Sequence, residues 1–164
     1  MYLPDGPTRP STDALEAFWA EARAAHPQAT LVPEYQVRWI GLDRPTTQQI
    51  FDLIRSGDKT GTFTLPWIVA RTDQPTPAVG DCIILIDFEG VPTLLVRLER
   101  VHEVAFGAIT AADTAIDGSP VRDLAVWKPL HTQYWGALLQ PFGLQVSPDM
   151  PVWVEKFSIV HDRR

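Results

Sequence analysis

The spacing of apolar and polar residues along the chain predicts three helices, and the first two have recognisable ends. Apolar side chains recur three or four positions apart over residues 13–26, with Asp13 placed to cap the first turn. Pro27 then disfavours helical backbone in the residue before it. A second amphipathic segment begins at Pro45, and Gly57 is well placed to end it in a left-handed turn.

The third helix and a set of strands complete the pattern. The helix is expected over residues 122–139, where Pro129 should kink it. Runs rich in β-branched and aromatic side chains predict strands over residues 60–69, 82–87, 93–104 and 150–160. Helices at both ends of a run of strands favour an α+β fold in which the strands curl into a small β-barrel.

The first ten residues contain three prolines and a glycine, so residues 1–12 are expected to form an irregular N-terminal arm. Residues 13–164 are then expected to form a single domain, because 164 residues with 45% hydrophobic side chains can build a core without disulfides. The sequence leaves three roles open for the arm: it covers a cleft, contacts a second subunit or is disordered. The oligomeric state cannot be read from the sequence.

The charge balance limits the partners of the protein. There are 14 Lys and Arg residues against 20 Asp and Glu, which gives a net charge of -6. Proteins that bind long duplexes neutralise many phosphates with basic side chains, so extended duplex binding is disfavoured. A modified nucleoside or a short single strand of RNA remains compatible with this composition.

Metal, disulfide and membrane chemistry are not indicated. The single cysteine, Cys82, falls in an apolar run and is expected to be an inert buried thiol. The four histidines lie at positions 26, 102, 131 and 161, without the spacing of zinc ligands. No apolar run approaches the roughly 18 residues of a membrane-spanning helix, and no signal pattern opens the chain. We therefore expect a cytoplasmic protein without a metal or other cofactor.

The segment from Gly57 to Thr62 is the first candidate for chemistry, because it joins a helix end to a strand start. In an extended chain the hydroxyls of Thr60, Thr62 and Thr64 share one face, and Lys59 joins Thr62 only if the strand twists or bulges. The order of a phosphate-binding P-loop is absent. Spacing alone favours an ordinary solvent-exposed turn lysine over a site residue.

Acidic and aromatic residues offer further candidates. The acids are Asp113, Asp117 and Asp123, which lie before or at the start of the third helix, and Asp117-Gly118 is also typical of a tight turn. A carboxylate near Lys59 would hold the lysine charged or accept a proton. Aromatic residues at a pocket rim stack on bases, and the candidates for substrate binding are Trp67, Trp127, His131, Tyr134 and Trp135, each of which is also compatible with core packing.

Five short motifs in order resemble a known family. The first is Ile-x-x-Gly-x-Lys-Thr-x-Thr over residues 54–62. The others are Val79-Gly80-Asp81, the segment from Trp127 through His131 to Tyr134-Trp135, Asp149-Met150-Pro151-Val152 and Glu155-Lys156-Phe157. Their order and spacing over about residues 35–162 resemble an ASCH-domain protein of the longer bacterial type.

The resemblance implies a PUA-like β-barrel with flanking helices and a cleft used in RNA or nucleoside chemistry. One branch of the family removes the acetyl group of N4-acetylcytidine with a lysine, a threonine and a glutamate. The first two correspond to Lys59 and Thr62, and Thr60 stands between them as a substrate-binding candidate. The glutamate corresponds to Asp117, whose carboxylate is about 1.5 Å shorter in reach.

Three functions follow as alternatives. The first is an amidohydrolase in which Thr62 attacks the acetyl carbonyl, Lys59 takes its proton or stabilises the oxyanion, and Asp117 tunes the lysine. The second is metal-independent RNA cleavage in the same cleft. The third is a non-catalytic module that binds RNA or a nucleotide-like ligand.

Overall fold

The structure, a computed structural model, describes residues 1–163. The long helices are α1 (Thr12–Ala25), α2 (Arg44–Ser56) and α5 (Leu124–Leu139), and the short ones are α3 (Pro66–Val69), α4 (Ala111–Thr114), η1 (Phe106–Ala108) and η2 (Gln140–Phe142). The strands are β1 (Tyr35–Arg38), β2 (Gly61–Thr64), β3 (Cys82–Ile86), β4 (Pro92–Ala105) and β5 (Pro151–Asp162). Residues 1–10 have no regular secondary structure.

The three long helices follow the predicted segments, although the cap of α1 differs. Ser11, not Asp13, caps α1, because its Oγ accepts a hydrogen bond from the Ala14 N–H at 3.2 Å. Asp43 caps α2 by accepting from the Thr46 N–H, and α2 ends at Gly57 with a φ of +78°. Only glycine adopts that conformation without strain, so this end of α2 could be read from the sequence.

Two strand predictions need correction. The strand expected over residues 60–69 ends at Thr64, because Pro66 starts α3, where its fixed φ suits the first turn of a helix. Strand β1 was not predicted, since four residues give too short an alternation to stand out. It pairs in parallel with β3, and the remaining neighbours in the sheet are antiparallel.

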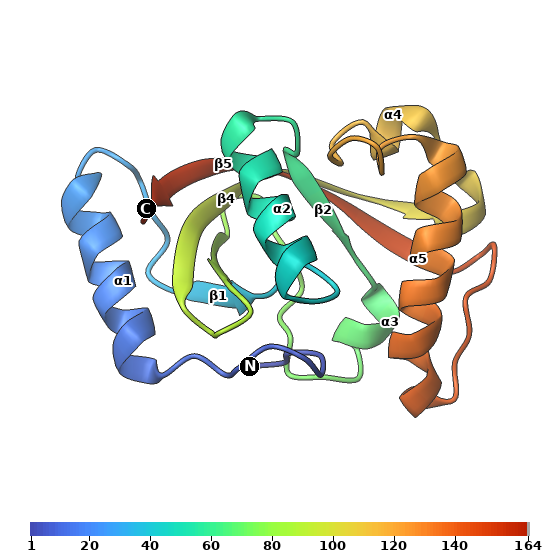
Figure 1. Cartoon of the computed structure of the whole chain (residues 1–164), viewed down its shortest axis with the longest axis horizontal. Coiled ribbons are helices and arrows are strands. Elements are labelled where there is room, and N and C mark those ends of the chain that lie inside the picture. The colour runs from blue at the N-terminus through green and yellow to red at the C-terminus, as the bar shows by residue number, and fades with distance from the viewer. Residues whose placement is uncertain (164) are drawn as a thin grey trace.

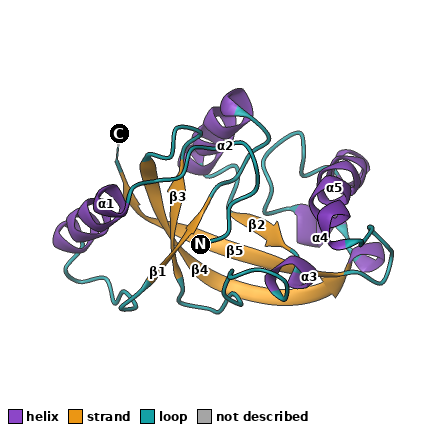
Figure 2. Ribbon diagram, turned by 90° about the horizontal axis from the view of Figure 1, so that it is seen from below, coloured by secondary structure: helices purple, strands orange, loops and turns teal. Residues whose placement is uncertain are grey.

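The five strands form one sheet in the order β1-β3-β4-β5-β2. Within residues 1–163, strands β1 and β2 are the two edges of the sheet and do not pair with each other. The sheet is therefore open, and together with the helices it forms an α+β fold. The expected barrel is therefore not confirmed. Figures 1 and 2 show a strongly twisted sheet, with α1 near one edge and α5 near the other.

Both faces of β3 are buried, and each packs against a different helix. Ile83 and Leu85 belong to the cluster that contains Phe51 of α2. Ile84 belongs to the cluster that contains Phe18 of α1. Two buried faces explain why this strand is apolar at every position.

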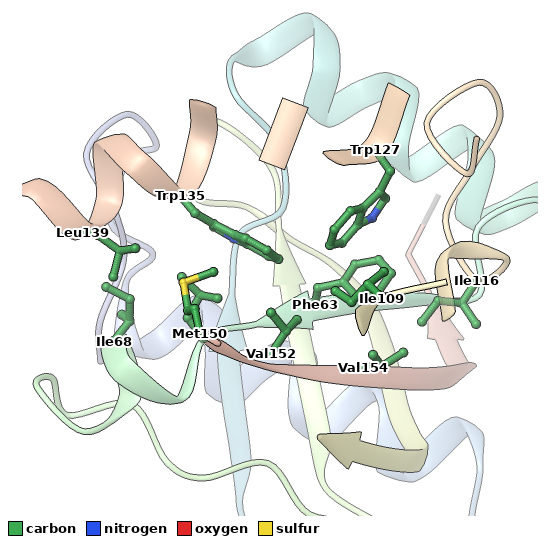
Figure 3. Packing of buried hydrophobic residues seen from close by; sticks show 11 residues of the cluster. Phe63, Ile68, Ile109, Ile116, Trp127, Trp135, Leu139, Met150, Val152 and Val154 are labelled. Carbon is green, nitrogen blue, oxygen red and sulfur yellow. The ribbon is translucent and has the colours of Figure 1, made fainter. Parts of the chain in front are cut away.

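A third cluster fills the space between α5 and the sheet. Trp127 and Trp135 point from α5 toward Phe63 on β2 and Val152 on β5 (Figure 3). The rings of Phe63 and Trp127 meet edge to face at 4.8 Å between centroids. This cluster fixes α5 at the β2 edge of the sheet.

The sheet also curls, so that its two edges approach each other on the inner face. Arg38 at the end of β1 makes an ion pair with Glu155 on β5, at 2.6 Å between Nη1 and Oε2, although β3 and β4 separate the two strands. Side chains therefore connect the edge strand β1 with β5, which lies beside the other edge strand β2, where backbone hydrogen bonds do not.

Candidate functional site

A cavity of about 270 Å³ lies where β2 passes between α2 and α5 (Figure 1). Each helix contributes side chains at helical spacing, from Thr46 to Leu53 on α2 and from Leu130 to Leu138 on α5. The inner wall is β2, and further lining comes from residues 2–4, 38–42 and 117–121 and from Lys59, Ile68 and Gln74. The cavity is therefore built from segments that are far apart in the sequence.

Lys59 and Asp117 form a buried ion pair on the wall of this cavity. The Lys59 Nζ lies 2.5 Å from the Asp117 Oδ1, and the two side chains are 5% and 9% exposed. The same Oδ1 accepts a hydrogen bond from the Gly118 N–H at 2.9 Å. Such hydrogen bonds orient a carboxylate, so both charged groups are held in one geometry.

The two loops that carry this pair are joined by further hydrogen bonds. The Thr60 N–H donates to the Ile116 carbonyl at 2.8 Å, and the Ser119 N–H donates to the Asp58 carboxylate at 2.8 Å. That bond and the Arg122 guanidinium lower the pKa of Asp58. This contact between the loops brings Asp117 within reach of Lys59, although aspartate is shorter than glutamate.

Strand β2 presents its two threonines on one face. Thr62 and Thr64 line the cavity on the face shared with Glu155, which is the cross-strand neighbour of Thr62. Phe63 packs on the opposite face against Trp127. The alternation of β2 therefore supplies two hydroxyls to the polar wall and one ring to the core.

A second buried ion pair stands on the same wall. Glu155 is completely buried, Arg38 is 6% exposed, and the Thr64 hydroxyl donates a hydrogen bond to Glu155 Oε1. Arg38 also donates to Gln36 Oε1 at 2.8 Å, and the Gln36 amide donates to Asp81 at 2.7 Å. Each of the two buried cations of the wall therefore has its own buried carboxylate, and the charges of the two pairs cancel.

His131 and Tyr134 face the cavity from α5 in uncharged form. Burial lowers the pKa of His131 to about 4 and raises the pKa of Tyr134 to about 12. The His131 Nδ1 lies 2.9 Å from the Trp127 carbonyl, which can only accept, so Nδ1 carries the ring hydrogen and Nε2 is left as an acceptor. At neutral pH these side chains offer an acceptor and a hydroxyl to a ligand, without adding charge.

The structure brings together six of the nine residues singled out in the sequence. The cavity is lined by Lys59, Thr62, Asp117, His131, Tyr134 and Trp135. Thr60, Trp67 and Trp127 do not line it. Thr60 binds neighbouring backbone, Trp67 packs against the α5 cluster, and Trp127 is fully buried in that cluster.

The sequence did not single out Arg38, Tyr2 and Leu3, which line the cavity, or Glu155, which pairs with Arg38, as site residues. Glu155 did carry a signal, because it shares a strand face with Phe157, where an apolar side chain is expected. A charged residue at such a position is usually paired when buried. Arg38 and the N-terminal residues carried no comparable signal, since tertiary folding alone brings them to the cavity.

Other expected features can be located without adding to the site. Cys82 is buried, and burial raises the pKa of its thiol. Within residues 1–163, no three His, Cys, Asp or Glu side chains gather at distances suited to a metal ion. No helix in that range has the length and apolar character needed to cross a membrane.

Comparison with known families identifies the part of the chain that carries both ion pairs. A family model described as the ASCH domain matches residues 38–161, well over half of the chain. The chain belongs to the ASCH domain family. The match begins at Arg38 and includes Lys59, Asp117 and Glu155, whereas the N-terminal arm and α1 precede it.

Two solved structures have the same fold. One is a protein from Enterococcus faecalis, 23% identical, with a TM-score of 0.78 and coverage of 91% of this chain and 89% of that chain. The other is an ASCH domain from Lactobacillus crispatus, 18% identical, with a TM-score of 0.76 and coverage of 97% and 99%. No curated protein matches. ASCH domains have a PUA-like fold that is associated with RNA binding, and these comparisons establish no particular reaction.

Proposed function

We propose that this ASCH domain binds one modified pyrimidine nucleoside in the cavity and hydrolyses its exocyclic amide, with N4-acetylcytidine as the model substrate. The observation that carries the proposal is the buried Lys59–Asp117 ion pair on the same cavity wall as the Thr62 hydroxyl. A hydroxyl, an amine and a carboxylate are the groups that acyl transfer needs for a nucleophile, an oxyanion partner and a proton acceptor.

The size and charge of the cavity support a small uncharged ligand. At about 270 Å³ it lies just below the range of about 300–1,000 Å³ that is usual for drug-sized ligands. Within the described residues 1–163, its charged pairs, Lys59 with Asp117 and Arg38 with Glu155, leave no free cation on the wall for a phosphate. A nucleoside fits these conditions better than a nucleotide chain.

In the proposed reaction the Thr62 Oγ bonds to the acetyl carbon, and the carbonyl oxygen becomes negative. The Lys59 ammonium stabilises this oxyanion, and the Asp117 carboxylate accepts the Thr62 proton, which later passes to the leaving amino nitrogen. Alternatively, Lys59 first passes one proton to Asp117, which lies 2.5 Å away, and the neutral amine then accepts the Thr62 proton. The C–N bond breaks, the amino nitrogen takes a proton and leaves as cytidine, and water releases acetate from Thr62.

The test is release of cytidine from N4-acetylcytidine by the wild-type protein and by Thr62→Val. Valine keeps the shape of threonine and leaves no unpaired charge, so this variant should fold. We expect turnover by the wild type and a loss of at least about a thousandfold in Thr62→Val, as for removal of other nucleophiles. Turnover that survives in Thr62→Val contradicts the mechanism.

Labelled single-stranded RNA, incubated with the same two proteins and with Lys59→Ala, tests the competing reaction. Under the proposal none of the three cleaves it. RNA cleavage that depends on Lys59, with no deacetylation, would replace the proposed function by ribonuclease activity. The absence of turnover on both substrates would leave a binding module and overturn the hydrolase.

A further inference from the structure

In the structure the N-terminal arm is limited to residues 1–10, because Ser11 already caps α1. The arm forms part of the cavity wall. Tyr2, Leu3 and Pro4 line the cavity. Tyr2 packs against the α5 cluster, and Leu3 packs against the α1 cluster. Burial raises the pKa of the Tyr2 phenol, with a further contribution from Asp5. The arm therefore lies across the gap between two parts of the core and does not extend into solvent.

The arm is fixed to the turn between β3 and β4. The Thr8 N–H donates to the Phe88 carbonyl at 2.9 Å. Gly90 lies so close to the arm that a Cβ there would come within 2.5 Å of the Thr8 carbonyl oxygen. Gly6 approaches the Trp39 ring, where a Cβ would lie 3.6 Å from the nearest ring carbon. These contacts fix the position in which residues 2–4 reach the cavity.

The arm and the Lys59–Asp117 pair line different parts of the cavity wall. Figure 1 shows the loop after α2 at the start of β2, and the N-terminal segment beyond the other end of that strand, near α3. A nucleotide within an RNA strand carries further nucleotides on both sides, so it reaches the cavity only through an opening wide enough for the strand. Because residues 2–4 form part of the wall, their side chains narrow the space open to such a strand.

We propose that Tyr2, Leu3 and Pro4 are specificity-determining residues that limit the ligand to a single nucleoside and exclude an RNA strand. This inference rests on the proposed function for the identity of the ligand. The ligand is then selected by size through a segment that lies outside residues 38–161, the part of the chain that matches the ASCH model. Removing the Tyr2 ring widens the cavity at the arm, so longer ligands gain access while the contacts around Lys59 stay unchanged.

Chemical labelling of Lys59 tests the inference without depending on catalysis. The chain has three lysines, of which Lys59 is buried and Lys156 is exposed and serves as the internal reference. An amine-reactive acetyl ester is applied to the full-length protein, and the labelled peptides are quantified by mass spectrometry. Labelling is repeated with saturating cytidine and with a ten-nucleotide RNA of cytidines.

The variants are Tyr2→Ala, Tyr2→Phe and, as matched control, Thr8→Ala, which changes an exposed side chain of the same arm and keeps its backbone hydrogen bond. In the wild type we expect cytidine, but not the RNA, to protect Lys59. In Tyr2→Ala the labelling of Lys59 rises severalfold relative to Lys156, and the RNA now protects it. Tyr2→Phe and Thr8→Ala behave as the wild type.

Two results would overturn the inference. One is unchanged labelling of Lys59 in Tyr2→Ala, because the arm then does not cover the site. The other is protection of the wild type by RNA and cytidine alike, because the arm then does not select by size. Loss of deacetylation with the labelling pattern intact would refute the proposed hydrolase while leaving the assignment of the arm in place.

Discussion

Removing one partner of the Lys59–Asp117 pair should destabilise the protein strongly, whereas replacing both should not. The side chains are 5% and 9% exposed, so a single neutral partner leaves an uncompensated charge in a poorly solvated place. Breaking a buried pair in this way costs about 3–5 kcal/mol. Asp117→Asn keeps the shape and the acceptor oxygen, so nearly all of its effect reports on the lost charge.

For a chain of this length, each kcal/mol lost from the free energy of unfolding lowers the melting temperature by about 2–4 °C. Asp117→Asn should therefore melt roughly 6–20 °C below the wild type. The double variant Lys59→Met, Asp117→Leu should return to within about 2 kcal/mol of the wild-type stability, because apolar pairs often replace buried ion pairs without loss. It should be inactive in deacetylation all the same, since it lacks the amine and the carboxylate.

Urea unfolding of the wild type, Asp117→Asn, the two single variants Lys59→Met and Asp117→Leu, and the double variant measures these differences. The matched control is Glu89→Gln, which breaks the surface pair with Arg44, whose side chains are 66% and 42% exposed. We expect a change below about 1 kcal/mol there, as is usual for exposed pairs. If Asp117→Asn costs no more than Glu89→Gln, or if the double variant is less stable than either single one, the pair is solvated and the reasoning fails.

Three further predictions concern the same wall and its support. Glu155→Gln should cost about 3–5 kcal/mol in urea unfolding by leaving Arg38 buried without its counter-ion; a cost near zero would show that water reaches the pair. His131 has a pKa of about 4 in the folded state against 6.5 in the unfolded state. The neutral ring therefore contributes at most about 3 kcal/mol to the free energy of unfolding, which is present above pH 6.5 and lost as the pH falls toward 4. The stability difference between wild type and His131→Gln should therefore shrink over that range, and a constant difference would contradict a neutral His131. Gly61→Ala should prevent stable folding because its Cβ would lie 2.4 Å from a backbone oxygen, whereas Gly136→Ala, in open space on α5, should stabilise by about 0.5–1 kcal/mol, both judged by thermal melting.

Local chemistry explains which parts of the fold were predictable. The end of α2 followed from Gly57, and the buried β3 followed from its continuous apolar run. The strand before Pro66 was predicted to be too long, because the β-branched and aromatic residues on both sides of that proline favour strands, whereas the proline itself starts a helix. The barrel was an inference about how the strands close, and closure depends on pairing between edges that no local pattern encodes.

The candidate site was predictable only in part, for the same reason. Spacing alone made Lys59 compatible with an ordinary turn lysine, and its burial arises from the loop that carries Asp117. The shorter reach of Asp117 was an open question in the sequence, and hydrogen bonds between the two loops bring the carboxylate to the amine. Arg38 comes from the opposite edge of the sheet, so its pairing with Glu155 depends on the curl of all five strands.

Mass spectrometry of the protein quenched during turnover of N4-acetylcytidine tests most directly whether Thr62 is the nucleophile. Cleavage after Lys59 gives a peptide over residues 60–71 that contains Thr60, Thr62 and Thr64. We expect an acetyl group on Thr62 that disappears when the substrate is exhausted. An acetyl group on another side chain, or turnover with no acetylated peptide at any time, would contradict this expectation.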